Sequence, residues 1–313
     1  MNNHPLIRYP SADHRSGFVA VIGKPNVGKS TLINAWLGHK VAIVSPKPQT
    51  TRHRLRGILT RPDAQIIFVD TPGIHQPRHK LGEFMVETAT KSIPDADVVL
   101  FLVDVSEMPT AEDEQIAQLI EEYSRAPVVL VLNKADLLPP EKVQPHSDAY
   151  FELVKHDEWM MISATRGDNR DKLLDMVVAR LPEGPRYYPP NQLTDQNMRF
   201  IVAELIREQV LRFAHQEVPH AVAVAVEEWK QRREDLTYIG ANIFVEKDSQ
   251  KGIIIGQGGR MLKRIGRAAR EEIEQLVGNR VYLDLWVKVR KKWRRDEQEL
   301  RRLGYALPRK KSF

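Results

Sequence analysis

The sequence contains no cysteine among its 313 residues. Disulfide bonds and thiolate metal sites are therefore excluded, and a reducing compartment such as the cytoplasm is the expected location. It also lacks any run of about 18 apolar residues, the length that crosses a bilayer, so we expect no transmembrane helix. The N-terminal stretch has no apolar signal-peptide core, and residues 1–15 are expected to form a flexible tail.

Acidic residues are slightly outnumbered: 47 lysines and arginines face 41 aspartates and glutamates, for a net charge of +6. An excess of this size only hints at a polyanionic partner, but its placement is more informative because the basic residues crowd the last third. The first cluster is Arg260, Lys263, Arg264, Arg267 and Arg270, and the second is Lys288, Arg290, Lys291, Lys292, Arg294 and Arg295.

The first part of the chain repeats a short apolar run, a polar motif and a helical stretch. The runs are Phe18–Ile22, Ile66–Val69, Val98–Val103, Val128–Leu132 and Met160–Ile162. Short runs without alternation indicate strands buried on both faces, as in a parallel sheet flanked by helices. The pattern predicts a doubly wound, mostly parallel α/β domain over residues 16–182, with ligands at the carboxyl ends of the strands.

A proline-rich segment, Pro182 to Pro190, cannot continue a helix and predicts a stiff linker at the domain boundary, over residues 183–197. Beyond it, periodicity predicts a helix, two strands, a helix and a third strand, which make a small α+β domain over 198–295. A basic C-terminal helix and tail would follow over 296–313. The expected elements are a helix over 199–215, strands at 221–226, 243–245 and 281–289, and a helix over 262–276.

The segment Gly23–Ser30 has the spacing G-x-x-x-x-G-K-S and lies between an apolar run and a helix. Its glycines let backbone N–H groups surround phosphates, Lys29 is expected at the β- and γ-phosphates, and the Ser30 hydroxyl should hold Mg²⁺. An accidental turn is the alternative. The nucleotide-binding residues predicted here are Gly23, Lys24, Pro25, Asn26, Val27, Gly28, Lys29, Ser30 and Thr31.

A second motif, Asp70-Thr71-Pro72-Gly73, follows the second apolar run. Asp70 can contact Mg²⁺ through water, and the Gly73 N–H can bond the γ-phosphate. A contact made only with the triphosphate would turn this loop into a switch. Taken alone, the tetrapeptide would also fit a simple turn.

The motifs after the fourth and fifth runs predict a guanine site. In Asn133-Lys134-Ala135-Asp136, the Asp136 carboxylate can accept two hydrogen bonds from guanine, which adenine cannot offer. We expect Asn133 to tie this loop to the phosphate loop and the Lys134 stem to cover the base. Ser163-Ala164 follows, and the Ala164 N–H could reach guanine O6.

In this order, the four motifs resemble those of the translation-factor-related GTPases. The resemblance implies that Gln49–His53 is switch I and that Thr51, or alternatively Thr50, completes the Mg²⁺ shell. Lys29, Thr51 and Gly73 would then act in hydrolysis. Ras-like relatives carry a glutamine where this chain has Ile74, so intrinsic hydrolysis should be slow. Asn26 either coordinates K⁺, as in potassium-stimulated relatives, or caps its turn.

The C-terminal domain carries Gly256-Gln257-Gly258-Gly259 between an isoleucine run and a basic helix. A G-x-x-G loop lets a nucleic-acid backbone approach closely, although alone it also fits a turn between helices. The order of elements resembles a bacterial-type KH domain, in which the isoleucine run is a short helix. The predicted RNA-binding residues are Gly256, Gln257, Gly258, Gly259, Arg260, Lys263, Arg264 and Arg267. Lysine, often present in this loop, is absent here.

Over residues 16–306 the chain is similar to a bacterial family that joins such a GTPase domain to a KH domain. That resemblance implies GTP and GDP as ligands, small-subunit ribosomal RNA near its 3′ end and the 30S particle as partners, and a monomer. Two other functions compete. One is an RNA-binding module with a passive GTPase domain, and the other is a GTPase acting at the inner membrane as a peripheral protein.

Several conspicuous side chains favour structural roles. Trp286 and Trp293 could stack on bases, yet we expect strand packing and helix anchoring respectively. His75 and His79 are expected to lie in a solvated loop rather than at a metal. The basic tail Pro308–Lys311 is expected to be solvated.

Overall fold

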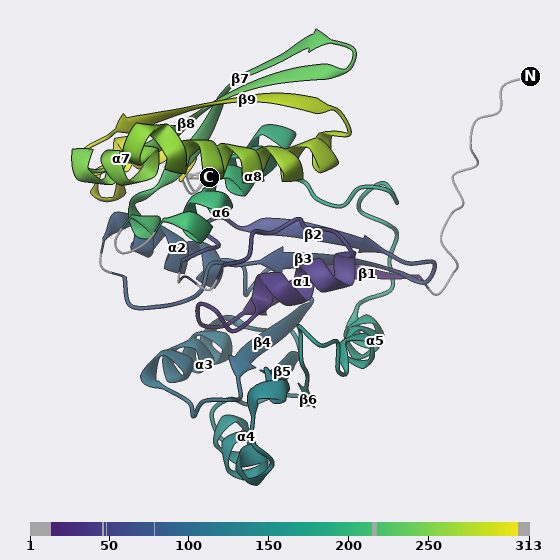
Figure 1. Ribbon diagram of the computed structural model, residues 1–313. Coiled ribbons are helices and arrows are strands. Elements are labelled where there is room, and N and C mark those ends of the chain that lie inside the picture. The colour runs from purple at the N-terminus through teal and green to yellow at the C-terminus, as the bar shows by residue number, and fades with distance from the viewer. Residues whose placement is uncertain (1–13, 46, 48, 78, 215–217, 306–313) are drawn as a thin grey trace, which may run out of the picture. The chain divides into compact units, whose positions relative to one another are not determined.

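The structure is a computed structural model that describes residues 14–45, 47, 49–77, 79–214 and 218–305 (Figure 1). Most of the expected N-terminal tail and the basic tail from residue 306 lie outside these residues. Contacts along the chain define two compact units that are discontinuous in sequence. The first unit comprises residues 1–42, 54–71 and 89–195, and the second comprises residues 43–53, 72–88 and 196–313.

The first unit contains a six-stranded sheet in the order β2-β3-β1-β4-β5-β6. Its strands are β1 (Arg15–Ile22), β2 (Leu55–Thr60), β3 (Ala64–Asp70), β4 (Val98–Asp104), β5 (Val128–Asn133) and β6 (Glu158–Met161). All neighbours pair in parallel except β2, which runs antiparallel to β3. The five predicted strands and the mostly parallel α/β class are confirmed. Strand β2 was not predicted, because Arg56 and Gly57 interrupt its apolar residues.

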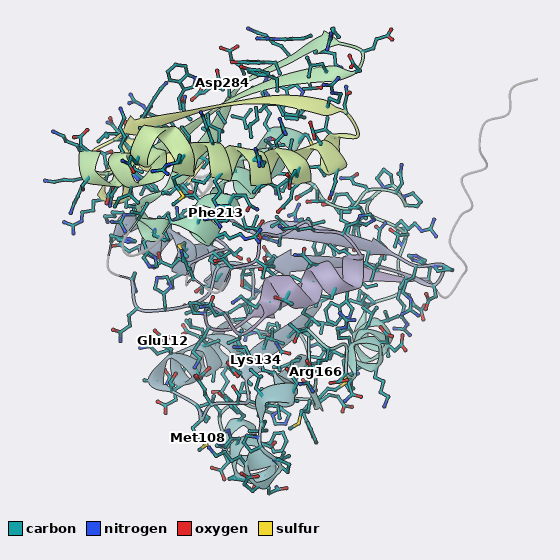
Figure 2. The ribbon with its side chains drawn as sticks, in the orientation of Figure 1. Met108, Glu112, Lys134, Arg166, Phe213 and Asp284 are labelled. Atoms are coloured by element: carbon teal, nitrogen blue, oxygen red, sulfur yellow. The ribbon has the colours of Figure 1, made fainter. Side chains whose placement is uncertain are left out.

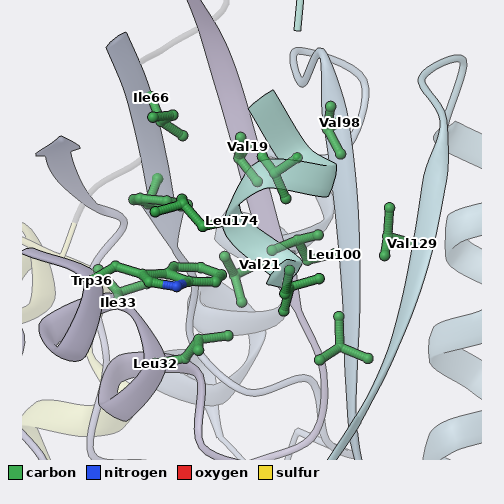
Figure 3. Packing of buried hydrophobic residues seen from close by; sticks show 14 of the residues in the cluster. Val19, Val21, Leu32, Ile33, Trp36, Ile66, Val98, Leu100, Val129 and Leu174 are labelled. Carbon is green, nitrogen blue, oxygen red and sulfur yellow. The ribbon is translucent and has the colours of Figure 1, made fainter. Parts of the chain in front are cut away.

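Helices connect these strands and cover the sheet. In the first unit they are α1 (Lys29–Leu37), α3 (Ala111–Tyr123), α4 (Val143–Phe151) and α5 (Arg170–Arg180), with short 3-10 turns at Ala135–Leu137 and Pro140–Lys142. Helix α2 (Lys80–Thr90) follows β3 in sequence, but most of it belongs to the second unit. Figure 3 shows Trp36 of α1 and Leu174 of α5 beside strand residues such as Val21 and Leu100. Trp36 stacks on Phe68 with ring centroids 4.8 Å apart. This core fixes the strand ends, where the polar motifs lie.

The predicted linker is bound to the first unit along much of its length. The buried Gln65 side chain accepts hydrogen bonds from the backbone N–H groups of Tyr187 and Tyr188 and donates to the Tyr188 carbonyl, at 2.7–2.9 Å. Farther on, the Ile58 N–H donates to the Leu193 carbonyl at 2.8 Å. Residues up to Asp195 therefore belong to the first unit rather than forming a separate spacer.

The second unit is built on a three-stranded sheet in the order β7-β8-β9. Its elements are α6 (Met198–Phe213), β7 (Ala223–Arg233), β8 (Leu236–Val245), α7 (Asp248–Ile255), α8 (Arg260–Val277), β9 (Arg280–Val289) and α9 (Glu297–Arg302), with 3-10 turns at Pro219–Ala221, Gln257–Gly259 and Trp293–Arg295. Strand β8 is antiparallel to β7 and parallel to β9. The predicted α+β order is confirmed, and α7 is the short helix expected before the glycine loop. None of the described helices is long and apolar enough to cross a membrane.

Candidate nucleotide and RNA sites

The loop between β1 and α1 can form only with glycine at two places. Gly28 has φ of 105°, and a Cβ there would lie 2.4 Å from Asn133 Nδ2. A Cβ on Gly23 would lie 2.2 Å from the Leu102 carbonyl oxygen of β4. Since both glycines are pressed against neighbouring strand ends, the loop wraps tightly at the start of α1, where helix N–H groups and the helix dipole favour an anion.

Lys29 is held inside this loop. Its ammonium donates to the carbonyl oxygens of Gly23 at 3.0 Å and Lys24 at 2.7 Å, and only 6% of the residue is exposed. Burial lowers the pKa of Lys29 to about 8, although the nearby Asp70 carboxylate raises it. A dianionic phosphate would replace the carbonyl partners and offset the cost of the buried charge.

Ser30 and Asp70 meet at the neighbouring strand end. The Ser30 hydroxyl donates to Asp70 Oδ2 at 2.7 Å, and the adjacent Thr71 hydroxyl anchors its loop on the Val21 carbonyl at 2.8 Å. Two hard oxygen donors side by side suit Mg²⁺, which takes few protein ligands and completes its octahedron with water and phosphate. Among the described residues, no group of three or more His, Asp or Glu side chains is placed to hold a metal ion.

Asn133 joins three loops. Its amide donates to the Val27 carbonyl of the phosphate loop at 2.7 Å and accepts from the Ala164 N–H at 2.9 Å. The first contact is the tie between loops that the sequence predicts. The second engages the N–H expected to reach guanine O6, so that contact stays a prediction.

Asp136 presents an unsatisfied carboxylate oxygen. Its Oδ1 is buried and has no hydrogen-bond partner among the described residues, while Oδ2 lies 3.7 Å from Arg166 Nε. Lys134, which Figure 2 labels together with Arg166, forms an ion pair with Asp104 at the end of β4. A buried acceptor without a donor is costly, and the guanine edge would supply two donors.

Sequence reasoning missed Asp104 and a second buried ion pair that holds the phosphate loop. Lys24 Nζ lies 2.6 Å from Asp113 Oδ2 and donates to Thr110 at 3.1 Å, with both charged side chains almost fully buried. The ammonium of Lys24 therefore ties the loop to α3. Lys24 was predicted among the nucleotide-binding residues. Because its ammonium is paired with Asp113, only its backbone is left for that role. Asp113 is the N3 residue of a capping box with Thr110, a motif that marks the start of α3, but only the fold shows that it also pairs with Lys24.

Switch I lies in the second unit, along one face of α6. The Val44 N–H donates to Glu208 Oε1 at 3.0 Å, the Lys47 ammonium donates to the carbonyls of Leu211 and Ala214, and Arg207 donates to the Thr50 carbonyl. The Thr50 hydroxyl donates to the Lys47 carbonyl at 2.6 Å. The Thr50 hydroxyl is therefore engaged within its own loop.

Buried charges fix the end of switch I. Arg207 is fully buried and pairs with Glu204 at 2.5 Å, while Arg52 is 1% exposed and donates to the Val222 carbonyl at 2.6 Å. Burial alone raises the pKa of Glu204, but Arg207 outweighs it, so the pKa lies below its usual value. The next residue, His53, stacks on Tyr305 at 4.5 Å, and burial lowers its pKa to about 4.

The switch II segment also belongs to the second unit. Its histidines were predicted to lie in a solvated loop; in the structure both are half-buried and form hydrogen bonds. His75 shares hydrogen bonds with the Gln49 amide at 3.0 Å and the Gly73 carbonyl at 2.9 Å. His79 Nε2 lies 3.3 Å from Arg294 Nη1. Burial is the main cause that lowers the pKa of His79, and the positive charge of Arg294 lowers it further. Ile74 is 3% exposed. No local pattern signals the contacts with Gln49 and Arg294, because these partners lie 26 and 215 residues away in the chain.

The glycine loop between α7 and α8 has the conformation that the sequence pattern requires. Gly256, Gly258 and Gly259 have φ of 70°, 60° and 77°, and a Cβ on Gly256 would lie 2.7 Å from Met261. The predicted basic residues lie exposed on the following helix: Arg260, Lys263, Arg264, Arg267 and Arg270. Arg264 stacks on Phe213, at the end of α6, at 4.2 Å. A glycine loop without bulky side chains, beside a row of cations, lets the phosphate backbone of a nucleic acid approach closely.

The two tryptophans differ in environment. Trp293 is fully buried and donates to the Ala221 carbonyl at 3.0 Å, which confirms its anchoring role. Trp286 is 61% exposed, so the predicted packing role is wrong for it. The alternation of β9 directs Val281 and Val287 into the core and Trp286 to the opposite face.

Fold and sites together define a P-loop GTPase joined to a KH domain. Comparison with known proteins agrees. A family model described as a 50S ribosome-binding GTPase matches residues 18–134, and a KH domain model matches residues 217–294.

Two solved structures are similar over nearly the whole chain. One is Era in complex with MgGDPNP and nucleotides 1506–1542 of 16S ribosomal RNA, and the other is a single-residue variant of Aquifex aeolicus Era bound to GDP and AlF4⁻. Each is 42% identical, covers 94% of this chain and 100% of its own, and has a TM-score of 0.89. The chain belongs to the Era family of GTPases.

Proposed function

We propose that this GTPase binds the 3′ end of small-subunit ribosomal RNA through its KH domain, under control of the bound nucleotide, and assists maturation of the 30S particle. The observation that carries the proposal is the relative that holds MgGDPNP and a 16S ribosomal RNA segment together. This chain contains the matching nucleotide motifs and a G-x-x-G loop with the φ values that close backbone approach needs.

The test is filter binding of a 16S 3′-end fragment to protein loaded with GDPNP or with GDP. We expect tighter binding in the GDPNP state and preference for 30S over 50S particles. Equal affinity in both states would leave an RNA-binding module with a passive GTPase domain. Preference for 50S particles would instead indicate the large subunit as the partner, in line with the matching family of 50S ribosome-binding GTPases.

Within the nucleotide site, the roles follow from the contacts of each residue. The N–H groups of Gly23–Thr31 would surround the phosphates, Lys29 would neutralise the β- and γ-phosphates, and Gly73 would contact the γ-phosphate. The remaining nucleotide-binding residues proposed are Asp70, Thr71, Pro72, Ile74, Asn133, Lys134, Asp136, Ser163 and Ala164. A bound GTP analogue would then order switch II through Gly73.

Mg²⁺ is the cofactor that the site fits. Ser30 would ligate it directly and Asp70 through water, since their oxygens lie 2.7 Å apart. Thr51 would complete the protein ligands when switch I reaches the nucleotide. The ion would neutralise charge on the phosphates during transfer to water. GTP hydrolysis in EDTA should therefore fall to the uncatalysed level.

The Ile74 side chain cannot position the water, because it is buried and has no hydrogen-bonding atoms. Asn26 adopts φ of 65° in the phosphate loop, a conformation that asparagine tolerates, and could present its carbonyl oxygen to K⁺. Replacing Na⁺ by K⁺ should raise the hydrolysis rate, and Asn26→Ala should abolish the difference. Equal rates in both salts would discard the ion while leaving the GTPase intact.

RNA contacts are proposed for Gly256, Gln257, Gly258, Gly259, Arg260, Lys263, Arg264 and Arg267. Arg260 bonds the Gln257 side chain at 2.5 Å and so stands beside the loop that lacks a lysine. We place the protein in the cytoplasm as a monomer. Association with the inner membrane is the alternative for the basic tail, and a liposome sedimentation assay would decide it.

A further inference from the structure

The outer face of the KH sheet carries aromatic side chains that the GTPase and the G-x-x-G loop do not use. On β9, Tyr282 is 56% exposed and Trp286 61% exposed. Strand β8 adds Tyr238, which pairs in register with Tyr282, and β7 adds Arg232. Asp284 lies between the two aromatic residues of β9, on the opposite side of that strand from α8 (Figure 2). We call Arg232, Tyr238, Tyr282, Asp284 and Trp286 the aromatic face.

This face is fixed in place before any ligand arrives. A single carboxylate oxygen, Asp284 Oδ2, accepts hydrogen bonds from the Tyr238 hydroxyl and from Trp286 Nε1, both at 3.2 Å. The rings of Tyr238 and Tyr282 stack with centroids 5.8 Å apart, and the Arg232 guanidinium lies 4.3 Å and 5.6 Å from them. The polar atoms of Tyr238 and Trp286 are thus satisfied within the face, while Tyr282 and Trp286 each keep more than half of their surface exposed to solvent.

The position of β9 connects this face with the RNA site. Strand β9 is at the edge of its sheet, and α7 and α8, which flank the G-x-x-G loop, pack against its inner side. Leu285 lies close to Gly266 in the first half of α8, since its Cδ1 would be 3.4 Å from a Cβ there. The next residue, Trp286, points to the outer face. An RNA strand that leaves the glycine loop needs only to cross one edge strand to reach it.

A KH groove clamps about four nucleotides, so a longer single strand must continue over neighbouring surface. Exposed aromatic rings with an arginine beside them are the usual means of holding such a strand, because every base offers a π-face. Tyr282 and Trp286 are four residues apart on one strand, or about 13 Å. Neither Arg232 nor Lys288, which extends the same row, has an ion-pair partner among the described residues. With the Glu228–Lys230 ion pair neutral, Arg232 and Lys288 stand beside one carboxylate, Asp284, which leaves a net charge of about +1 for the phosphates.

We propose that the aromatic face is a second RNA contact, which stacks bases of the single strand continuing beyond the G-x-x-G loop without selecting their sequence. The inference rests on the proposed RNA binding by the KH domain. It assigns to Tyr282 and Trp286 a stacking role and to Asp284 a positioning role, since Asp284 holds the rings of Tyr238 and Trp286 through their polar atoms.

The test compares two RNAs on the full-length protein. One is a short oligonucleotide that only fills the groove, of about four nucleotides, and the other carries an added unstructured tract at either end. Tyr282→Ala combined with Trp286→Ala should lower the affinity for the longer RNA at least about tenfold, which is the effect of losing one base–aromatic stack. The shorter RNA should bind within about twofold of wild type, and GTP affinity should not change.

Matched variants separate stacking from structure. Trp286→Phe should retain most of the affinity for the longer RNA, because an aromatic surface remains. Trp159→Ala removes an exposed tryptophan of the first unit, 47% exposed, and should change nothing. Unchanged binding of the longer RNA by the double variant would overturn the inference and leave a protein partner as the occupant. Equal losses on both RNAs would also overturn it, since the defect would then lie in the groove. Wild type that binds neither RNA would refute the proposed function itself.

Discussion

At the scale of single residues, Asp136 has the clearest chemical assignment. One carboxylate oxygen is buried without a partner among the described residues, and only 11% of the side chain is exposed. Two donors arranged as on guanine would satisfy it, whereas adenine would leave it unpaired. The cost of that mismatch is what should exclude ATP.

Asp136→Asn replaces an acceptor by a donor and should transfer the preference from GTP to xanthosine triphosphate, whose C2 oxygen accepts. We expect GTP affinity to fall about a hundredfold, or roughly 2.7 kcal/mol. Nucleotide competition against both proteins measures this. If wild type is displaced equally well by ATP and GTP, the base pocket has been assigned to the wrong residues.

Lys29 makes nucleotide binding depend on pH. Its pKa is about 8 in the protein without nucleotide and must rise when phosphates surround it. Above pH 8 the free protein holds this lysine neutral and the complex holds it charged, so binding takes up a proton. GTP affinity should therefore decrease as pH rises from about 8 to 10, by up to tenfold per unit.

Calorimetry at pH 9 in buffers of different ionisation enthalpy would count the protons taken up. We expect a value near one for wild type and near zero for Lys29→Met. Uptake that persists in the variant would assign the proton to another group.

At the scale of elements, the packing of switch I on α6 is the contact with most consequence. The Lys47 ammonium bonds the last carbonyls of that helix, where a cation is also favoured by the helix dipole. Removing it should loosen the whole segment, because Val44 and Thr50 are held by the same helix.

Lys47→Ala should weaken local packing by about 1 kcal/mol, which raises the hydrogen-exchange rate of the Val44 amide about fivefold. Lys142→Ala, which changes an exposed lysine of the first unit, serves as control. Exchange in residues 43–50 that matches wild type would mean that Arg207 and Glu208 hold the segment without Lys47.

The difference between what the sequence predicts and what it does not lies in how local each signal is. The P-loop, the Asp70 motif and the G-x-x-G loop are short patterns whose glycines and charges declare their chemistry. Strand β2 has too few apolar residues to show a period. Arg207 and Arg52 look like surface arginines until Glu204 and the 219–222 turn are placed beside them. The packing role predicted for Trp286 was wrong, because the alternation of apolar residues along 281–289 indicates a strand but does not tell whether its second face is covered.

At the scale of the molecule, two separate apolar cores support the two activities. Valines, leucines and isoleucines of β1, β3 and β4 form the first, and those of α6, β8 and α8 form the second. Negative charges placed on the G-x-x-G loop should therefore weaken RNA binding without changing nucleotide binding.

Gln257→Asp combined with Gly258→Asp should lower RNA affinity at least about tenfold, or roughly 1.4 kcal/mol, by repelling phosphates. Gly258 has φ of 60° and no atom within 4 Å of an added Cβ, so aspartate meets no steric clash there, and the left-handed backbone strains it less than most residues. GTP affinity and intrinsic hydrolysis should stay near wild type. Filter binding and a nucleotide titration of the same protein measure both.

The control pairs Gly258→Asp with Gly278→Asp at the other end of α8. Gly278 has φ of 71° and equally open surroundings, so the two changes match in charge and backbone strain. Only the first should impair RNA binding. Equal effects would indicate a response to net charge, and binding that survives both would move the RNA site off the glycine loop.

The discontinuous units also decide what an isolated domain would be. The chain passes between the units at 42/43, 53/54, 71/72, 88/89 and 195/196, which makes five crossings. A nick between residues 195 and 196 would sever only one of them, and the fragments would remain joined, because residues 43–53 and 72–88 of the N-terminal fragment belong to the second unit. A recombinant fragment beginning at residue 196 would lack Leu81 and Met85, which pack with Trp293 and Tyr305. It would expose that cluster to water, so the cooperative folding unit of this KH domain extends into the GTPase sequence.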